Sequence, residues 1–88
     1  MAKLLLSNTF LDELAGLDDA VVEEAWAKLE TVEAFPGVGS ALLEPYLRST
    51  YGPSCLKVAV YRYDLIYRRN DADGEVHILG IVPQRAVR

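Results

Sequence analysis

Two stretches in the second half of the chain decide the fold: residues 56–69, LKVAVYRYDLIYRR, and residues 76–83, VHILGIVP. The first is rich in β-branched residues and alternates in polarity from residue 62 onward, and the second is nearly all apolar. Both patterns are typical of strands. Between them, residues 70–74 read NDADG, which predicts a polar hairpin turn. We therefore expect three consecutive strands, at Leu56–Val60, Arg62–Arg69 and Val76–Val82.

The first half of the chain predicts one short strand followed by two helices. The run Lys3–Leu6 has the length of a buried strand. From residue 10 to residue 32, apolar residues recur every three or four positions, which places one apolar stripe along a helix. Gly16 and the aspartates after it interrupt this stripe. We expect a helical hairpin at about Thr9–Ala15 and Asp19–Ala34.

A long connection, from about Pro36 to Pro53, joins the helices to the later strands. Its proline and glycine residues break regular structure. Residues 41–47 are nevertheless too apolar for a free linker. We therefore expect Leu42, Leu43 and Leu47 to pack on the core.

These elements give the order β, α, α, β, β, β in one domain that spans residues 1–88. The chain is short enough for a single core, and its 51% hydrophobic and 25% charged residues are typical of a globular protein. The predicted fold class is α+β, with a helical hairpin packed on a small antiparallel sheet.

Several classes of protein are excluded by composition. The single cysteine, Cys55, allows no internal disulfide and no thiolate cluster, which favours a reducing cytoplasm. The sequence has no run of 18 apolar residues, so no membrane span is predicted. The single histidine, His77, has no second ligand nearby, so we expect no metal and no cofactor. The glycines lack the context of a phosphate-binding loop, and the serines lack that of a hydrolase nucleophile.

Charge is divided unevenly along the chain. Residues 1–47 carry a net charge of −7 and residues 48–88 a net charge of +3. The cations of the second half are Arg48, Lys57, Arg62, Arg68, Arg69, Arg85 and Arg88, and five tyrosines are interleaved with them. Arginine and tyrosine together can bind phosphates and stack on bases. The alternative is a solvated charged surface with tyrosines that belong to the core.

The second half of the chain resembles the RelE/ParE superfamily, the toxins of bacterial type II toxin–antitoxin pairs. The resemblance consists of a basic and apolar strand, the strand YDLIYR at residues 63–68, an acidic turn, an apolar strand and a following arginine. The order β, α, α and the proline–glycine connection match as well, so the resemblance covers nearly the whole chain. It implies a cytoplasmic toxin that inhibits growth by acting on translation or on DNA gyrase, and that a cognate antitoxin neutralises.

The RNA-cleaving branch of this superfamily uses cationic and aromatic side chains without a metal. Lys57 matches a lysine of the first strand in the second half, and Arg85 matches the arginine after the last strand. Asp64 stands where the middle strand of active members carries an arginine, and Arg62, expected on the same face, could substitute for it. The resemblance therefore implies a catalytic set of Lys57, Arg62 and Arg85.

Two further positions depart from the RNA-cleaving pattern. Cys55 stands where a second lysine is expected, and the sequence ends at Arg88 before a catalytic tyrosine. Three functions therefore remain open: a non-catalytic inhibitor of a host enzyme, a metal-independent, ribosome-dependent mRNA endoribonuclease, and an inactivated relative that only binds protein. Phosphate or a partner would bind at Arg48, Tyr61, Tyr63, Arg68 and Arg88. The expected antitoxin is an amphipathic, partly acidic segment that wraps the sheet and helices.

Overall fold

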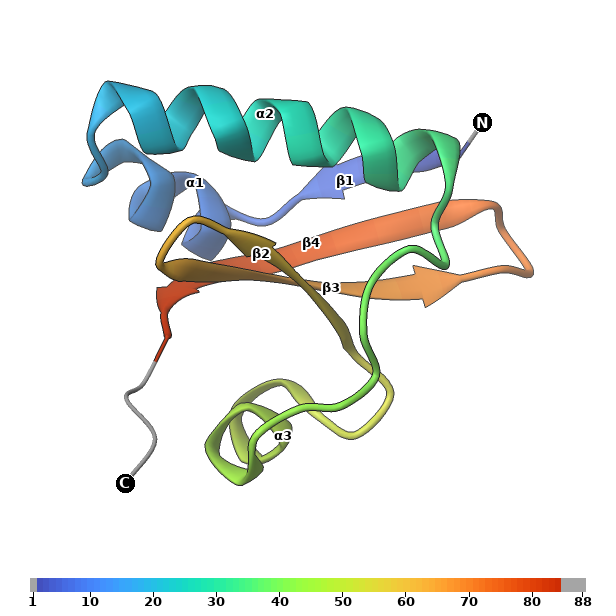
Figure 1. Ribbon diagram of the computed structural model, residues 1–88. Coiled ribbons are helices and arrows are strands. Elements are labelled where there is room, and N and C mark those ends of the chain that lie inside the picture. Colours follow the sequence, from blue (N-terminus) through green and yellow to red (C-terminus); the bar gives the residue numbers. More distant parts are fainter. Residues whose placement is uncertain (1, 85–88) are drawn as a thin grey trace.

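The computed structural model describes residues 2–84, in which one four-stranded sheet lies between helices (Figure 1). The strands lie in the order β1, β4, β3, β2. Their bounds are Lys3–Leu6 for β1, Leu56–Val60 for β2, Tyr63–Asn70 for β3 and Glu75–Pro83 for β4. The four predicted strands are thus present, and the α+β class is confirmed.

The prediction of a wholly antiparallel sheet is wrong, because β1 pairs with β4 in parallel. The path of the chain explains this. Helix α2 (Asp19–Ala34) returns the chain to the end of the sheet where β1 begins, so β2 starts in the same direction as β1 (Figure 1). The two turns that follow reverse the chain twice, and β4 therefore runs parallel to β1.

Two caps set the predicted helical hairpin. Helix α1 (Asn8–Ala15) begins after Ser7, whose Oγ accepts a hydrogen bond of 3.0 Å from the backbone N–H of Phe10. Helix α2 begins after Asp18, whose Oδ1 accepts one of 3.1 Å from the N–H of Val21. Each cap satisfies an N–H that has no partner inside its helix. Both helices cover one face of the sheet (Figure 1).

The main core lies between this helical hairpin and the sheet. Its buried members come from both helices and from the last three strands: Phe10, Leu14, Val21, Ala25, Leu29, Val32, Val60, Leu65, Tyr67, Val76, Ile78 and Ile81. The helical members follow the three-and-four spacing seen in the sequence. Burial of this apolar surface is the principal stabilising contribution to the fold.

A third helix, α3 (Pro45–Tyr51), lies on the opposite face of the sheet (Figure 1). It falls inside the connection of residues 36–53, where the prolines and glycines predict irregular structure. Proline is well tolerated in the first turn of a helix, because the N–H that it lacks has no helical partner there. Leu47 of α3 joins Leu43, Cys55 and Ile66 in a second buried cluster. Both faces of the sheet are therefore covered in part.

Of the three leucines expected on the core, Leu43 and Leu47 are buried as predicted. Leu42 is not, since it is 83% exposed. Its backbone N–H donates to Oγ of Ser40 in a tight turn, and this turn directs the next residue, not Leu42, toward the sheet. The prediction for Leu42 is wrong.

The connection between α2 and α3 is fixed to the sheet by Tyr67. The hydroxyl of this buried side chain donates a hydrogen bond of 2.7 Å to the carbonyl of Pro36 and accepts one of 2.9 Å from the N–H of Gly39. A side chain at position 39 would collide with it, since a Cβ atom there would lie 2.7 Å from the hydroxyl oxygen. Residues 36–39 are thus held against β3.

Replacing Tyr67 with Phe removes both hydrogen bonds and keeps the ring. We expect the free energy of unfolding to fall by about 1 to 3 kcal/mol, because the N–H of Gly39 and the carbonyl of Pro36 lose a buried partner. Urea titration followed by circular dichroism measures this. The control is Tyr63→Phe, in the same strand and half-buried. Equal losses in the two variants would contradict the role given to the Tyr67 hydroxyl.

Candidate functional site

The face of the sheet that carries α3, called here the α3 face, holds two charged residues singled out in the sequence, Lys57 and Asp64. Ile66, Leu79 and Val82 pack against α3 on this face. Lys57 and Asp64 have the same orientation, because side chains alternate along each strand and their strand neighbours Leu56 and Leu65 belong to the main core. The α3 face therefore brings one predicted site residue, Lys57, beside α3.

Lys57 is bound to a carboxylate of its own chain. Its Nζ donates to Oε1 of Glu44, the residue immediately before α3. The side chain of Lys57 is 20% exposed and that of Glu44 is 43% exposed. Glu44 stands at the N-cap of α3, yet its carboxylate makes no capping hydrogen bond. The carboxylate is directed to Lys57 instead.

The ion pair changes the protonation of both partners. The hydrogen bond from Lys57 lowers the pKa of Glu44 below its ordinary value, against a smaller opposing effect of burial. The same bond raises the pKa of Lys57, and the negative charge of Asp64 raises it further. Both groups are therefore charged throughout the neutral range.

Asp64 is the most buried charged side chain among residues 2–84, at 4% exposed. Its Oδ1 accepts a hydrogen bond of 3.2 Å from Nε2 of Gln84. Strand pairing sets Ile66, two residues after Asp64, opposite Lys57, so the two charged side chains are diagonal neighbours on this face, and the charge of Asp64 raises the pKa of Lys57. The centre of the α3 face thus combines one ammonium with two acidic side chains, Glu44 and Asp64.

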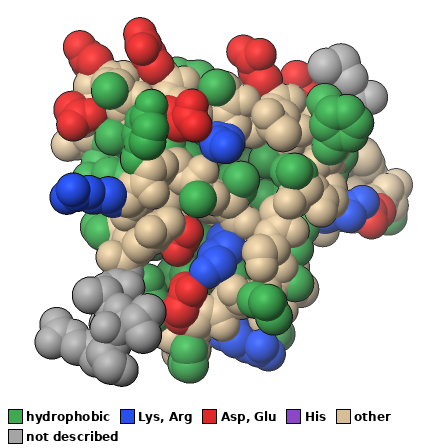
Figure 2. All heavy atoms as spheres, viewed as in Figure 1, with side chains coloured by type: hydrophobic (Ala, Val, Ile, Leu, Met, Phe, Trp, Pro, Cys, Tyr) green, Lys and Arg blue, Asp and Glu red, His purple; other side chains and the backbone are tan. Residues whose placement is uncertain are grey.

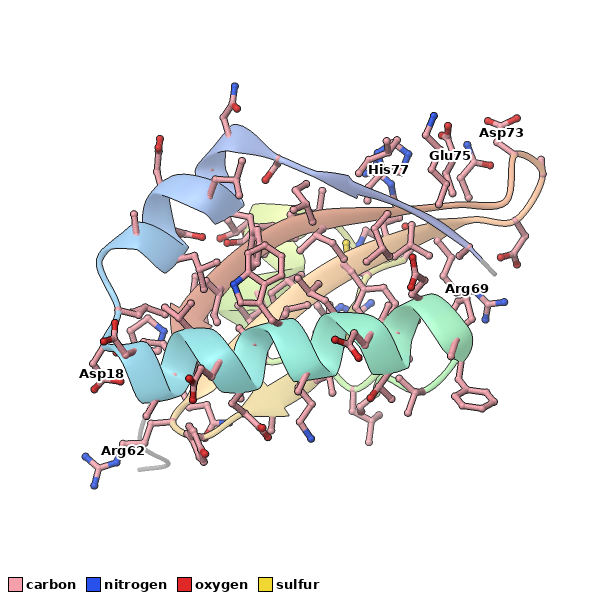
Figure 3. All side chains as sticks on the ribbon, turned by 90° about the horizontal axis from the view of Figure 1, so that it is seen from above. Asp18, Arg62, Arg69, Asp73, Glu75 and His77 are labelled. Carbon is pink, nitrogen blue, oxygen red and sulfur yellow. The ribbon has the colours of Figure 1, made fainter. Side chains whose placement is uncertain are left out.

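Arg62 does not lie beside Lys57. Strand β3 begins only at Tyr63, and Arg62 occupies the turn before it, where Tyr61 has a positive φ of 54°. The alternation assumed for this residue therefore does not apply. Arg62 lines a pocket with Asp18 and Val21 at the start of α2, and Figure 3 shows it at that end of the molecule. The expectation that Arg62 shares the face of Asp64 is wrong.

The other predicted site residues are scattered. Arg48 of α3, Arg68 of β3 and Tyr61 are exposed, whereas Tyr63 is half-buried against the main core. Figure 2 shows cations dispersed over the visible face and acids gathered along the edge that α2 forms. Arg85 and Arg88 lie outside the described residues. The structure therefore does not gather this set into one described site.

A groove lies between α3 and the end of β4, with a volume of about 350 Å³. It is lined by Tyr46, Leu47, Thr50, Tyr51, Val82, Pro83 and Gln84. Tyr46, which lines this groove, is two residues after Glu44, so the groove adjoins the segment that carries the carboxylate of the ion pair. In the sequence, Tyr46 and Tyr51 are only two of the five tyrosines interleaved with the cations. A helix beginning at Pro45 would have been the signal that brings them together.

Residues 2–84 contain no cluster of His, Cys, Asp and Glu suited to a metal ion. His77 is half-buried, and its Nε2 lies 3.3 Å from Oε1 of Glu75. Within the same residues, no helix is long and apolar enough to span a membrane. Cys55 is buried, and burial raises the pKa of its thiol while the nearby charge of Arg68 opposes this.

Glu44→Gln should lower stability most near neutral pH, by less than about 1 kcal/mol because the pair is partly exposed. The lowered pKa of Glu44 means that its contribution is present above 4.5, the ordinary value, and is lost as pH falls through the lowered one. The raised pKa of Lys57 means that its contribution is present below 10.5 and is lost as pH rises through the raised value. Urea midpoints at pH 3 and pH 7 measure this, with exposed Glu30→Gln as control. A larger loss at pH 3 would contradict the assignment.

Comparison with known proteins gives matches in structure and none in sequence. Neither a family model nor a curated protein sequence matches the chain. The isolated E. coli RelE toxin matches with a TM-score of 0.77 and 20% identity, over 99% of this chain and 88% of that one. The intact E. coli RelBE toxin–antitoxin complex matches with a TM-score of 0.77 and 22% identity, over 98% and 100%.

A third match comes from a different bacterium. The toxin–antitoxin complex RelBE2 from Mycobacterium tuberculosis matches with a TM-score of 0.64 and 24% identity, over 94% of this chain and 98% of that one. These identities are low, so the comparison concerns the fold. The resemblance to the RelE/ParE superfamily is confirmed at that level: along nearly its whole length, this chain has the fold of RelE toxins.

Proposed function

We propose that this chain is the toxin of a type II toxin–antitoxin pair, and that it acts by binding a host target without cutting RNA. The observation that carries the first part is the agreement with RelE over nearly the full length of both chains. Two of the matching structures are complexes of toxin and antitoxin. By this likeness the chain has a cognate antitoxin of its own.

The charges of the α3 face support binding over cleavage. Cleavage of RNA by side chains alone needs positive charge where the phosphate becomes more negative. Here the ammonium of Lys57 is paired with Glu44, and Asp64 adds a second negative charge. The net charge of −4 also limits the counterions that RNA binding would release. The host target then is a protein, such as DNA gyrase or a component of translation.

The specific alternative is a metal-independent endoribonuclease that uses Lys57, Arg62 and Arg85. The groove beside Lys57 favours it, because tyrosine side chains line that groove and can stack on bases. The separation of Arg62 from Lys57 speaks against it. An inactivated relative that binds only its protein partner is the third candidate.

Growth of a bacterium after induction of the chain separates these functions. We expect growth to stop, and co-expression of the small gene next to this one to restore it. We also expect messenger RNA to stay intact. The double variant that combines Lys57→Ala with Arg85→Ala should remain toxic, because no cleavage is involved. Unimpaired growth would remove the toxin proposal. If messenger RNA is cleaved when the unchanged chain is induced and stays intact with the double variant, the ribonuclease is established instead.

The helical hairpin offers apolar contacts for the antitoxin. Trp26 of α2 is 43% exposed, and Leu11 of α1 is similarly exposed. A large aromatic side chain left partly in water on a stable helix is a frequent anchor of protein interfaces. Unpaired cations among residues 2–84, such as Arg48 and Arg68, would bind the acidic part of the same segment.

Trp26 is the only tryptophan, so its fluorescence reports directly on antitoxin binding. We expect its emission to shift to shorter wavelength when the antitoxin covers it. Trp26→Gln should weaken the complex about tenfold, or about 1.4 kcal/mol, through loss of buried aromatic surface. Ala27→Gln, at the exposed neighbouring position, is the control and should bind normally. Unchanged emission and affinity would place the antitoxin elsewhere.

A further inference from the structure

One side of helix α2 carries a row of acidic side chains around a partly exposed tryptophan. The members of the row follow one another at alternating steps of four and three residues, so they lie along one side of the helix. The buried positions of α2 form a separate row. The exposed row extends over about 21 Å, at a rise of about 1.5 Å per residue. Its residues, called here the α2 stripe, are Asp19, Glu23, Trp26, Glu30 and Glu33.

The acids of the α2 stripe have no cation of their own chain within residues 2–84. None of the four carboxylates takes part in an ion pair of that part of the chain. The lysine of the helix, Lys28, lies outside the stripe, and its Nζ pairs with Glu24 at 3.7 Å. Figure 2 shows acidic side chains gathered along the edge that α2 forms. The stripe therefore presents four negative charges that can pair with the cations of another molecule.

Trp26 determines where on the stripe such a cation would bind. It is the central residue of the row and is 43% exposed. Glu23 and Glu30 lie about one helical turn before and after it. The face of an indole attracts a cation, most often an arginine, and two neighbouring carboxylates attract the same charge. An acidic segment would be repelled here, and an apolar one would leave the carboxylates without partners. The stripe therefore fits a surface that carries arginine or lysine.

The host target of the proposed function has the complementary charge. That target is a protein that works on DNA or in translation, and such proteins bind nucleic acid through basic surfaces. Carboxylates in a row on a packed helix meet a basic surface with their spacing already fixed, so little ordering is lost on binding. The charge of the stripe thus identifies the kind of surface that covers Trp26.

We propose, resting on the toxin function given above, that the α2 stripe binds a basic surface of the host target. Trp26 is the central contact, and the acids on either side pair with arginine or lysine of the target. This also gives the antitoxin a direct mode of action. A segment that covers Trp26 covers the middle of the stripe and excludes the target from it.

Growth arrest by variants of the stripe tests the role of its charge. Glu23→Gln combined with Glu30→Gln removes two charges and keeps the size of both side chains. Two exposed charge pairs contribute roughly a factor of ten to an affinity, so about tenfold more of this variant than of the wild type should be needed to halve the growth rate. Glu23→Asp with Glu30→Asp retains the charges and should stay close to the wild type. Quantitative immunoblotting over a series of inducer concentrations measures the amount of each toxin.

A second double variant separates the stripe from general charge. Glu24→Gln with Asp73→Asn makes the same change in net charge outside the stripe and should be as toxic as the wild type. Circular dichroism establishes that each variant is folded. If the wild type does not arrest growth, the toxin function itself fails. If it does, undiminished toxicity of the Gln variant would leave the stripe to the antitoxin alone and overturn the proposal. An equal loss in the Asp variant or in the Glu24 and Asp73 control would overturn it as well.

Discussion

Strand β3 is buried on both of its faces, and the rest of the structure depends on this. Leu65 and Tyr67 belong to the core under the helical hairpin, and Ile66 between them belongs to the cluster under α3. A strand in this position fixes its register, since a shift by one residue would exchange the two faces. The Tyr67 hydroxyl extends the constraint to the connection before α3, through Pro36 and Gly39. The position of Glu44 follows from that connection.

Local patterns in the sequence were sufficient for most of the secondary structure. The apolar stripe and the Ser7 and Asp18 caps predict the helical hairpin, because each signal lies within one turn of the helix that it starts. The direction of β1 was not predictable in this way. It depends on pairing with β4, about 70 residues away, which no local pattern records. Helix α3 was missed because its seven residues are too few to show a period.

The sequence predicted single residues of the candidate site, but not which residues lie together in it. Lys57 was identified from the sequence, and its orientation follows from strand alternation. Its partner Glu44 was not identified, because the pairing depends on α3 and on the bond between Ser40 and Lys57, both created by tertiary structure. Arg62 was misplaced for a local reason. Strand β3 begins at Tyr63, one residue later than predicted, so Arg62 lies in the preceding turn, on another part of the surface.

The fold of this chain does not determine the chemistry of its α3 face, and the reason is physical. A RelE fold needs apolar residues at the positions that fill two clusters, and many sequences meet that need, which is consistent with structural agreement at 20 to 24% identity. Charges on the α3 face are under no such constraint. Asp64 is tolerated near the core because Gln84 hydrogen-bonds its carboxylate and Lys57 lies close by, not because the fold requires an acid there. Function therefore has to be argued from Lys57, Glu44 and Asp64, and the fold alone does not decide it.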